Sequence, residues 1–301
     1  MERLGTCLVC GNDAFEDFLI AQDHYKKDYF SLQKCASCGF VFTNPRPSLS
    51  EIGDFYTSTT YLSHTSHDRS FMRGVYRAAR KYMMNKKHEM LLQYTKGKEQ
   101  LSILDFGCGT GDFLKFCSTK GHKVAGYEVE EHARMRAKEI NGIEPYGPDQ
   151  MDAIKFGAYD VITLWHVLEH VHMLNEQVDL FRKWLVKDGI LVLALPNIES
   201  YDAEMYKEHW EGLDVPRHLY HFSPSAVDNL LVKHGFEKLA IRPLVLDAYY
   251  SVMYSERNAG KGNLYSMVKG VFSGFQLNKK AADTGKYSSL AYFYKLKSVG
   301  V

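Results

Sequence analysis

Residues 103–114 read Ile-Leu-Asp-Phe-Gly-Cys-Gly-Thr-Gly-Asp-Phe-Leu, and this stretch constrains the fold more than any other. An apolar run typical of a buried strand precedes three glycines at every second position, and a helical pattern begins at Phe113. Glycine adopts positive φ and has no Cβ, so a ligand can lie directly against this turn. A dinucleotide site needs its third glycine one position later, where Asp112 stands, and the GxxxxGKS/T sequence of phosphate-binding loops is absent. The turn therefore predicts a ligand site of another kind.

Asp105 and the glycines after it resemble motif I of the class I S-adenosylmethionine-dependent methyltransferases. In that family the glycine loop passes under the amino-acid end of the cofactor, and an acidic residue ending the next strand binds the ribose hydroxyls. Residues 123–129 have the pattern of that strand, with Glu128 at its C-terminal end. A carboxylate that accepts two hydroxyl protons is the same chemistry that an acidic residue performs in nucleotide-binding folds. The resemblance thus implies S-adenosylmethionine as the cofactor.

Strands and helices alternate from Leu101 onward, which predicts a parallel sheet with helices on both faces. With the resemblance, this implies an α/β, Rossmann-like methyltransferase sheet of seven strands. The expected strands cover residues 102–107, 123–129, 144–146, 159–165, 189–195, 236–246 and 289–297, the last antiparallel as is usual in the family. Ligands of such folds bind beyond the carboxyl ends of the strands. The expected cofactor-binding residues are Asp105, Gly107, Cys108, Gly109, Gly111, Glu128, Val129, Leu164 and Trp165.

Two identical Cys-x-x-Cys knuckles, Cys7 with Cys10 and Cys35 with Cys38, lie near the N-terminus, each followed by a glycine. Four thiolates complete a tetrahedral zinc site without an open position. A redox motif needs a single cysteine pair beside the start of a helix. We expect the protein in the cytoplasm, because it begins without an apolar signal segment. Disulfides are rare in that compartment. We therefore predict a small N-terminal zinc-binding module whose Zn²⁺ is structural, because the segment is too small to bury a core of its own.

The predicted organisation is a zinc-ribbon-like module over 1–44, a helical linker or lid region over 45–100 and a methyltransferase domain over 101–301 with insertions at about 198–222 and 248–287. The whole arrangement resembles bacterial methyltransferases that carry such a module. Tyr56 and Tyr61 either fold over the cofactor or pack down their own loop. A helical pattern over 68–94 has a basic face that is either solvated, which we favour, or placed on an anionic membrane.

Methyl transfer is an in-line displacement in which the enzyme aligns the acceptor and, for some acceptors, removes a proton. Past the fourth strand, His166, Glu169 and His170 share one face if the chain turns helical. They resemble the Glu-x-x-Glu-His segment of ubiquinone-pathway O-methyltransferases, whose side chains can hold a divalent metal, with His166 replacing the first Glu. These side chains therefore either bind a second metal, or brace the loop while His166 approaches the cofactor or acceptor.

A second polar segment, residues 214–221, belongs to the insertion at about 198–222. This insertion follows the active edge of the fifth strand and should fold over the pocket. His218 and His221 titrate near neutrality and are the candidates for the base. Arg217 either clamps an anionic acceptor or orders the loop by hydrogen bonding. The expected catalytic residues are His166, His218 and His221, with one of the last two as base and His166 in a positioning role.

The formal net charge of +1 provides no global field for nucleic acid, so we expect a small-molecule or a sugar- or lipid-linked acceptor. Two alternatives remain: a catalytically inactive scaffold, and an RNA or protein methyltransferase that uses the zinc module for recognition. Apolar residues among lysines in 248–287 indicate either a substrate lid or a surface for peripheral membrane contact. The sequence leaves the acceptor atom and the oligomeric state open.

Overall fold

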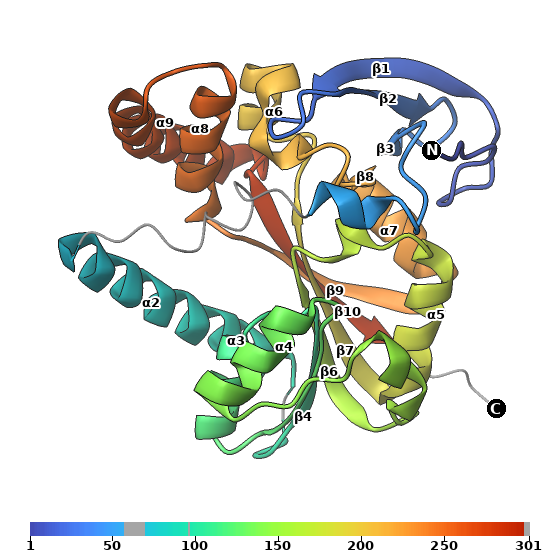
Figure 1. Cartoon of the computed structure of the whole chain (residues 1–301). Helices are drawn as coiled ribbons and strands as arrows, with labels where there is room; N and C mark the ends of the chain where they lie inside the picture. Colours follow the sequence, from blue (N-terminus) through green and yellow to red (C-terminus); the bar gives the residue numbers. More distant parts are fainter. Residues whose placement is uncertain (57–69, 96, 298–301) are drawn as a thin grey trace.

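The computed structural model describes residues 1–56, 70–95 and 97–297, with the backbone alone for residues 70–80 (Figure 1). Its larger sheet has the strand order β5-β4-β6-β7-β10-β9. The first four strands in that order are parallel, and β10 runs antiparallel to both β7 and β9. The strands span Ser102–Phe106 (β4), Lys123–Tyr127 (β5), Tyr159–Trp165 (β6), Leu185–Pro196 (β7), Phe236–Pro243 (β9) and Ser289–Leu296 (β10).

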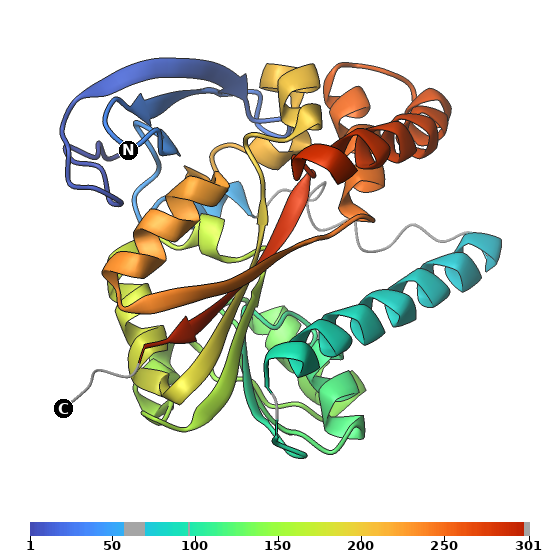
Figure 2. The same cartoon turned by 180° about the vertical axis from the view of Figure 1, so that it is seen from behind.

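Helices cover both faces of this sheet, as the alternating pattern predicts (Figures 1 and 2). Successive residues of a strand point to opposite faces, so Leu191 and Leu193 of β7 pack on one side and Val192 on the other. The first face packs against α5 (Leu174–Trp184) and α7 (Pro224–Lys233), and the second against α2 (Ser70–Tyr94) and α3 (Asp112–Thr119). The Ser223 hydroxyl accepts from the backbone N–H of Ala226 and so caps α7.

The expected sheet of seven strands is wrong, because the structure has six strands in this sheet among its described residues. Residues 144–146 contribute an isolated parallel bridge between Tyr146 and Tyr127. The Tyr146 N–H donates to the Gly126 carbonyl and its carbonyl accepts from the Glu128 N–H, at 2.8 and 3.0 Å. The next residue that would donate to β5 in this ladder is Pro148, which has no N–H, so the ladder does not extend beyond Tyr146 in that direction.

A second sheet of four antiparallel strands joins the N-terminal segment to the 198–222 insertion. It contains β1 (Phe15–Gln22), β2 (Tyr29–Cys35), β3 (Val41–Thr43) and β8 (Tyr220–His221). The rest of that insertion forms α6 (Tyr201–Tyr206) and two short 3₁₀ turns, Lys207–His209 and Glu211–Leu213. The division at residues 44 and 100 stays a prediction.

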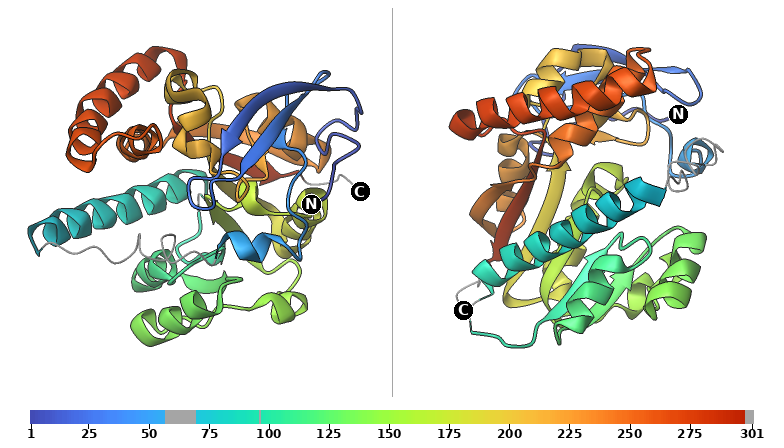
Figure 3. Two further views of the ribbon diagram at one scale, coloured as in Figure 1. Left: turned by 45° about the horizontal axis from the view of Figure 1, so that its top comes forward. Right: turned by 90° about the vertical axis from the view of Figure 1, so that its left-hand side faces the viewer.

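The 248–287 segment forms most of two packed helices, α8 (Asp247–Asn258) and α9 (Asn263–Thr284). Figures 1 and 2 place the four-stranded sheet, α6, α8 and α9 at the end of the large sheet where β6 and β7 finish. Figure 3 shows the same group from two further directions, with α2 extending below α9. The remaining helix α4 (Glu131–Arg136) follows β5 and continues into a π-helical turn, Ala137–Asn141.

Candidate active site

The glycine loop between β4 and α3 needs its glycines for two different reasons. Gly107 has φ +76°, and a Cβ there would lie 2.5 Å from Val167, so the residues after β6 pack directly on it. Gly109 also has positive φ, +54°, but a Cβ there would meet nothing within 4 Å. Gly111 is the left-handed N-cap of α3. The space over Gly109 is therefore where a ligand can approach the backbone.

Two carboxylates flank this loop. The Glu128 carboxylate accepts hydrogen bonds from the backbone N–H groups of Gly109 (2.8 Å) and Glu130 (3.0 Å), beside the open space over Gly109. Asp105 lies beneath the loop, where it accepts from the Thr163 hydroxyl at 2.6 Å. Burial raises the pKa of Asp105 to about 7, although the Thr163 hydrogen bond opposes this shift. Of the two carboxylates, Glu128 thus lies beside the open space over Gly109, and Asp105 supports the loop from below.

The other expected cofactor residues take different positions. Cys108 packs in a small core cluster and Leu164 is fully buried, so the side chains of both are occupied by the protein interior, whereas Val129 is 63% exposed. Trp165 packs edge-on against Phe113. Lys87 belongs to the basic face of α2 for which solvation is favoured above, but its ammonium lies 4.1 Å from the Trp165 ring centroid. Helical periodicity alone could not reveal this contact, because it depends on how α2 docks.

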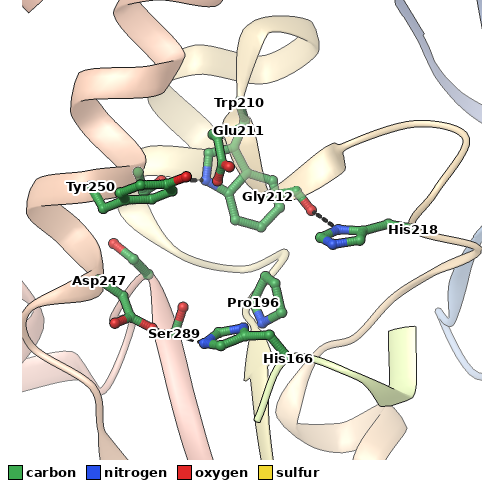
Figure 4. A pocket seen from close by; sticks show the side chains of 11 residues that line it. His166, Pro196, Trp210, Glu211, Gly212, His218, Asp247, Tyr250 and Ser289 are labelled. Atoms are coloured by element: carbon green, nitrogen blue, oxygen red, sulfur yellow. Dashed lines mark hydrogen bonds and ion pairs between the residues drawn. The ribbon is translucent and has the colours of Figure 1, made fainter. Parts of the chain in front are cut away.

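A cavity of about 290 Å³ lies beyond the carboxyl ends of β6 and β7 (Figure 4). It is lined by His166, Pro196, Trp210, Glu211, Gly212, His218, Asp247, Tyr250, Ser251, Ser288 and Ser289. Figure 4 shows His218 on one side of the cavity and Asp247 and Tyr250 on the other. The cavity therefore combines the ends of two parallel strands, the start of β10, the 198–222 insertion and α8.

His166 is held as a cation at the floor of this cavity. Its Nε2 lies 3.1 Å from Asp247 and its Nδ1 lies 3.6 Å from Glu169. Burial opposes the charge, but the hydrogen bond to Asp247 and the nearby charge of Glu169 outweigh it and raise the pKa of His166 to about 10. The residue has φ +58°, an uncommon conformation outside glycine that tends to occur at functional sites. An imidazolium has no lone pair, so His166 is not suited to act as a base at neutral pH.

The two histidines of the insertion lie in different surroundings. His218 lines the cavity, and its Nδ1–H donates to the Gly212 carbonyl at 2.9 Å. His221 does not line the cavity; its Nε2 lies 3.2 Å from the Thr43 hydroxyl, within the four-stranded sheet. Burial lowers the pKa of His221 to about 3, with a further contribution from His218. The structure therefore brings His218, and not His221, to the cavity with His166.

Glu169 and His170 lie in a single 3₁₀ turn, Leu168–His170, instead of a helix that would place them on one face with His166. Glu169 is 1% exposed, and neither carboxylate oxygen has a hydrogen-bond partner among the described residues. Ligand atoms of Glu169, His170 and His218 lie within 4.8 Å of one another. Burial and His218 lower the pKa of His170 to about 4. This group, rather than one that contains His166, has the spacing for a second metal.

Arg217 lies in the interior and does not reach the cavity. Its guanidinium is fully buried and pairs with Asp214 at 2.7 Å and Asp23 at 3.1 Å. It also donates to the Phe55 carbonyl at 3.2 Å. These contacts match the interpretation in which Arg217 orders the loop, and they leave it inaccessible to an acceptor. Tyr56 was expected either to fold over the cofactor or to pack down its own loop, and its hydroxyl lies 2.9 Å from His170 Nδ1. Tyr61 lies outside the described residues.

Three cavity residues carried no signal in the sequence. Asp247 and Tyr250 come from α8, more than 80 residues after His166 along the chain. Glu211 stands between Trp210 and Asp214, and no motif or periodicity marks it. Burial, then Asp214 and Asp247, raise the pKa of Glu211 to about 8, so this carboxyl keeps its proton at neutral pH. Only the tertiary fold brings a charged histidine and a neutral carboxyl into one small cavity.

The four N-terminal cysteines converge as their spacing predicts. All four Sγ atoms lie within 4.8 Å of one another, with Cys7 to Cys38 at 3.6 Å and Cys10 to Cys35 at 3.5 Å. Zinc–sulfur bonds of about 2.3 Å in a tetrahedron place sulfurs about 3.8 Å apart. In each knuckle the glycine after the second cysteine has positive φ and donates to the carbonyl of the first. The donor set fits a four-thiolate zinc site.

The methyltransferase domain family matches residues 75–241, more than half of the 301-residue chain, and the chain therefore belongs to this family. It is an S-adenosylmethionine-dependent methyltransferase. The glycine loop, the open space over Gly109 and the Glu128 carboxylate fit that cofactor.

Two known proteins illustrate the similarity. The chain is 30% identical over 94 residues to a malonyl-[acyl-carrier protein] O-methyltransferase of Erwinia pyrifoliae. The matched segment covers 30% of this chain and 36% of that protein. It thus spans about a third of that relative. A crystal structure of a proposed sarcosine dimethylglycine methyltransferase from Galdieria sulphuraria superposes with a TM-score of 0.54 at 14% identity, over 73% of this chain and 88% of the other. This second similarity concerns the fold alone.

Glu128→Ala is expected to weaken binding of S-adenosylmethionine by about 1–3 kcal/mol, because it removes a two-point acceptor for the ribose hydroxyls. Calorimetry measures the affinity. Glu131→Ala, which removes an exposed carboxylate three residues later, is the matched control and should bind normally. An unchanged affinity of Glu128→Ala would remove this residue from the site.

His166→Asn is expected to cost stability in a pH-dependent way. Asparagine tolerates the left-handed backbone but cannot carry the charge. The folded pKa of about 10 exceeds the unfolded value of about 6.5, so the stabilisation by His166 is complete below about pH 6.5 and is lost as the pH rises through about 10. Denaturant unfolding of wild type and variant should therefore differ most at the lower pH. A constant difference from pH 6 to pH 10, or the same trend in the exposed His132→Asn, contradicts the assignment.

Proposed function

We propose that this enzyme transfers a methyl group from S-adenosylmethionine to a small-molecule acceptor group that carries a removable proton. The cavity at the ends of β6 and β7 is the observation that carries the proposal, because its volume of about 290 Å³ suits a small polar group. Gly109 and Glu128 would hold the cofactor, which supplies an electrophilic methyl group when bound. The relative that acts on a malonyl carrier protein supports a small acyl acceptor of this kind.

His218 is the proposed base. A carbonyl can only accept, so the 2.9 Å contact to Gly212 places the proton of the neutral ring on Nδ1 and leaves the lone pair on Nε2. That nitrogen can take the acceptor's proton as the methyl group transfers. The charged His166 cannot do so, and His221 lies outside the cavity lining.

Two other cavity groups would orient the acceptor. Glu211 keeps its proton at neutral pH and can donate a hydrogen bond, and the Ser288 hydroxyl is buried without a hydrogen-bond partner in the described part of the chain. Both donors line the cavity with His218. They suit an acceptor that presents oxygen atoms.

The proposal is tested by incubating the enzyme with methyl-labelled S-adenosylmethionine and a metabolite extract, in parallel with carrier proteins and RNA. The label is expected in a small molecule or in the acyl group of a carrier, released from the protein by mild alkali. Label found in RNA or in protein side chains would contradict the small-acceptor proposal. The absence of transfer to any fraction, with cofactor bound, would favour the inactive scaffold.

We infer that the four N-terminal cysteines hold one structural Zn²⁺. A four-thiolate site contributes folding free energy directly, so the metal would stabilise a segment with little core of its own. This role leaves the chemistry of methyl transfer to the cavity.

Purified protein is therefore expected to contain one zinc per chain, and Cys35→Ser is expected to lose the metal and to unfold more easily. Metal analysis of freshly prepared, reduced protein measures the stoichiometry. Cys117→Ala removes a buried cysteine outside the cluster and should keep the zinc. Wild-type protein without zinc would refute the site.

A further inference from the structure

Helix α9 carries its large apolar side chains on the outside of the molecule. Seven of them are between 43% and 73% exposed, and together they define what we term the apolar outer face: Leu264, Tyr265, Met267, Val268, Val271, Phe272 and Phe275. In Figures 1 and 2, α9 lies on the outer side of α8, away from the large sheet. A contiguous exposed apolar surface of this kind marks an interaction site.

The inner side of α9 consists mainly of small residues, including Ser266, Gly270, Ser273 and Gly274, buried against α8. A Cβ at Gly274 would lie 2.9 Å from Tyr249 Cα, and one at Gly270 would lie 3.0 Å from Met253 Cβ. A helix packed on a soluble core normally turns its large apolar residues inward. Small residues between close helices and large apolar residues outside are instead typical of helices in contact with lipid.

The charge around α9 identifies the partner. Residues 259–286 have a net charge of +4, whereas the whole chain carries +1. The charged residues of this segment are five lysines and one aspartate: Lys261, Lys269, Lys279, Lys280, Lys286 and Asp283. A second copy docked on the apolar outer face would bring its own segment of net charge +4 to the same surface. Anionic headgroups would neutralise the lysines, at about 1 kcal/mol per basic residue near the surface.

None of the helices in the described part of the chain is long and apolar enough to span a membrane. A helix with an apolar face and lysines, packed along one side on its own protein, suits the plane of the bilayer surface instead. We propose that α9 docks this enzyme on an anionic membrane surface, with the apolar outer face in the lipid and Lys261, Lys269 and Lys279 among the headgroups. Lys280 and Lys286 lie over the Tyr201 ring.

Helix α8 connects this surface to the active site. Tyr249 and Met253 lie against the glycines of α9, while Asp247 and Tyr250 line the cavity. Docking therefore brings the cavity to the membrane surface, where an acceptor attached to a lipid or to a membrane-associated carrier would be presented. This consequence rests on the proposed function; the docking itself does not.

The docking is tested by co-sedimentation of the full chain with vesicles of phosphatidylcholine alone and of phosphatidylcholine mixed with phosphatidylglycerol. Binding is expected to the anionic vesicles and to weaken as salt is added. Phe272→Glu with Phe275→Glu should lower it at least about tenfold, and Lys261→Glu with Lys279→Glu should abolish the preference for anionic lipid. Phe156→Glu is the matched control, because Phe156 is 68% exposed, as Phe272 is, but precedes β6 at the opposite end of the sheet.

Three results would overturn the proposal. The first is a wild-type protein that does not sediment with anionic vesicles at low salt. The second is a double phenylalanine variant that binds as tightly as Phe156→Glu. The third is a wild-type dimer in analytical ultracentrifugation that Phe272→Glu separates, which would show that a second copy covers the apolar outer face. All three measurements omit cofactor and acceptor, so they are independent of whether methyl transfer is found.

Discussion

Replacing Arg217 by methionine is expected to lower the free energy of unfolding by about 3–5 kcal/mol, one of the two largest effects we expect for a single substitution in this chain. The guanidinium is fully buried, and so is its partner Asp23. Methionine fills much of the volume but leaves Asp23 and Asp214 without their cation. A buried carboxylate without a partner destabilises the fold by more than the intact ion pair stabilises it, because no water solvates the remaining charge. Denaturant unfolding monitored by circular dichroism measures the loss.

Two further variants separate charge from packing. Adding Asp23→Asn to Arg217→Met removes the buried carboxylate that has lost its cation, and should recover part of the lost stability. Arg182→Met is the matched control: its side chain is 46% exposed and 3.9 Å from Asp179, so its loss should cost at most about 1 kcal/mol. If Arg217→Met costs no more than Arg182→Met, the buried ion pairs do not hold the 198–222 insertion to the N-terminal segment.

His218→Ala is expected to reduce turnover by about 10²–10⁴-fold with the affinity for S-adenosylmethionine unchanged, because general-base assistance is lost while the cofactor site stays intact. The Gly212 carbonyl accepts from Nδ1, so a neutral His218 ring carries its lone pair on Nε2, and this side chain lines the cavity. Turnover is measured once an acceptor is identified, and cofactor affinity by calorimetry. The acid limb of the pH–rate profile, which reports protonation of the base, should disappear in the variant.

His209→Ala provides the matched control, because His209 belongs to the same insertion but is 46% exposed and does not line the cavity. It should retain wild-type turnover. A loss of less than tenfold in His218→Ala, with the fold intact, would place the base elsewhere. If chelators abolish wild-type turnover and a metal other than the zinc is found, the cluster of Glu169, His170 and His218 holds a cation instead.

Much of the architecture follows from local patterns in the sequence. The strand predicted at 159–165 is β6, and the antiparallel last strand lies within one residue of its prediction. Strand periodicity, glycine turns and capping serines are properties of a few neighbouring residues, so they can be recognised without knowing the fold. The convergence of the four cysteines could also be predicted, because two Cys-x-x-Cys pairs at that spacing are typical of a four-thiolate zinc site.

The contents of the active site depend on how distant segments pack together. Asp247 contacts His166 and raises its pKa, and the Gly212 carbonyl accepts from Nδ1 of His218. Arg217 pairs with Asp23 in the interior, away from the cavity. These effects depend on burial and on charges from segments far apart in the chain, and no local period encodes them. Local sequence patterns were sufficient to predict the class of enzyme and the cofactor loop. The packing of distant segments decided which histidine is charged, which can accept a proton, and which lies outside the cavity.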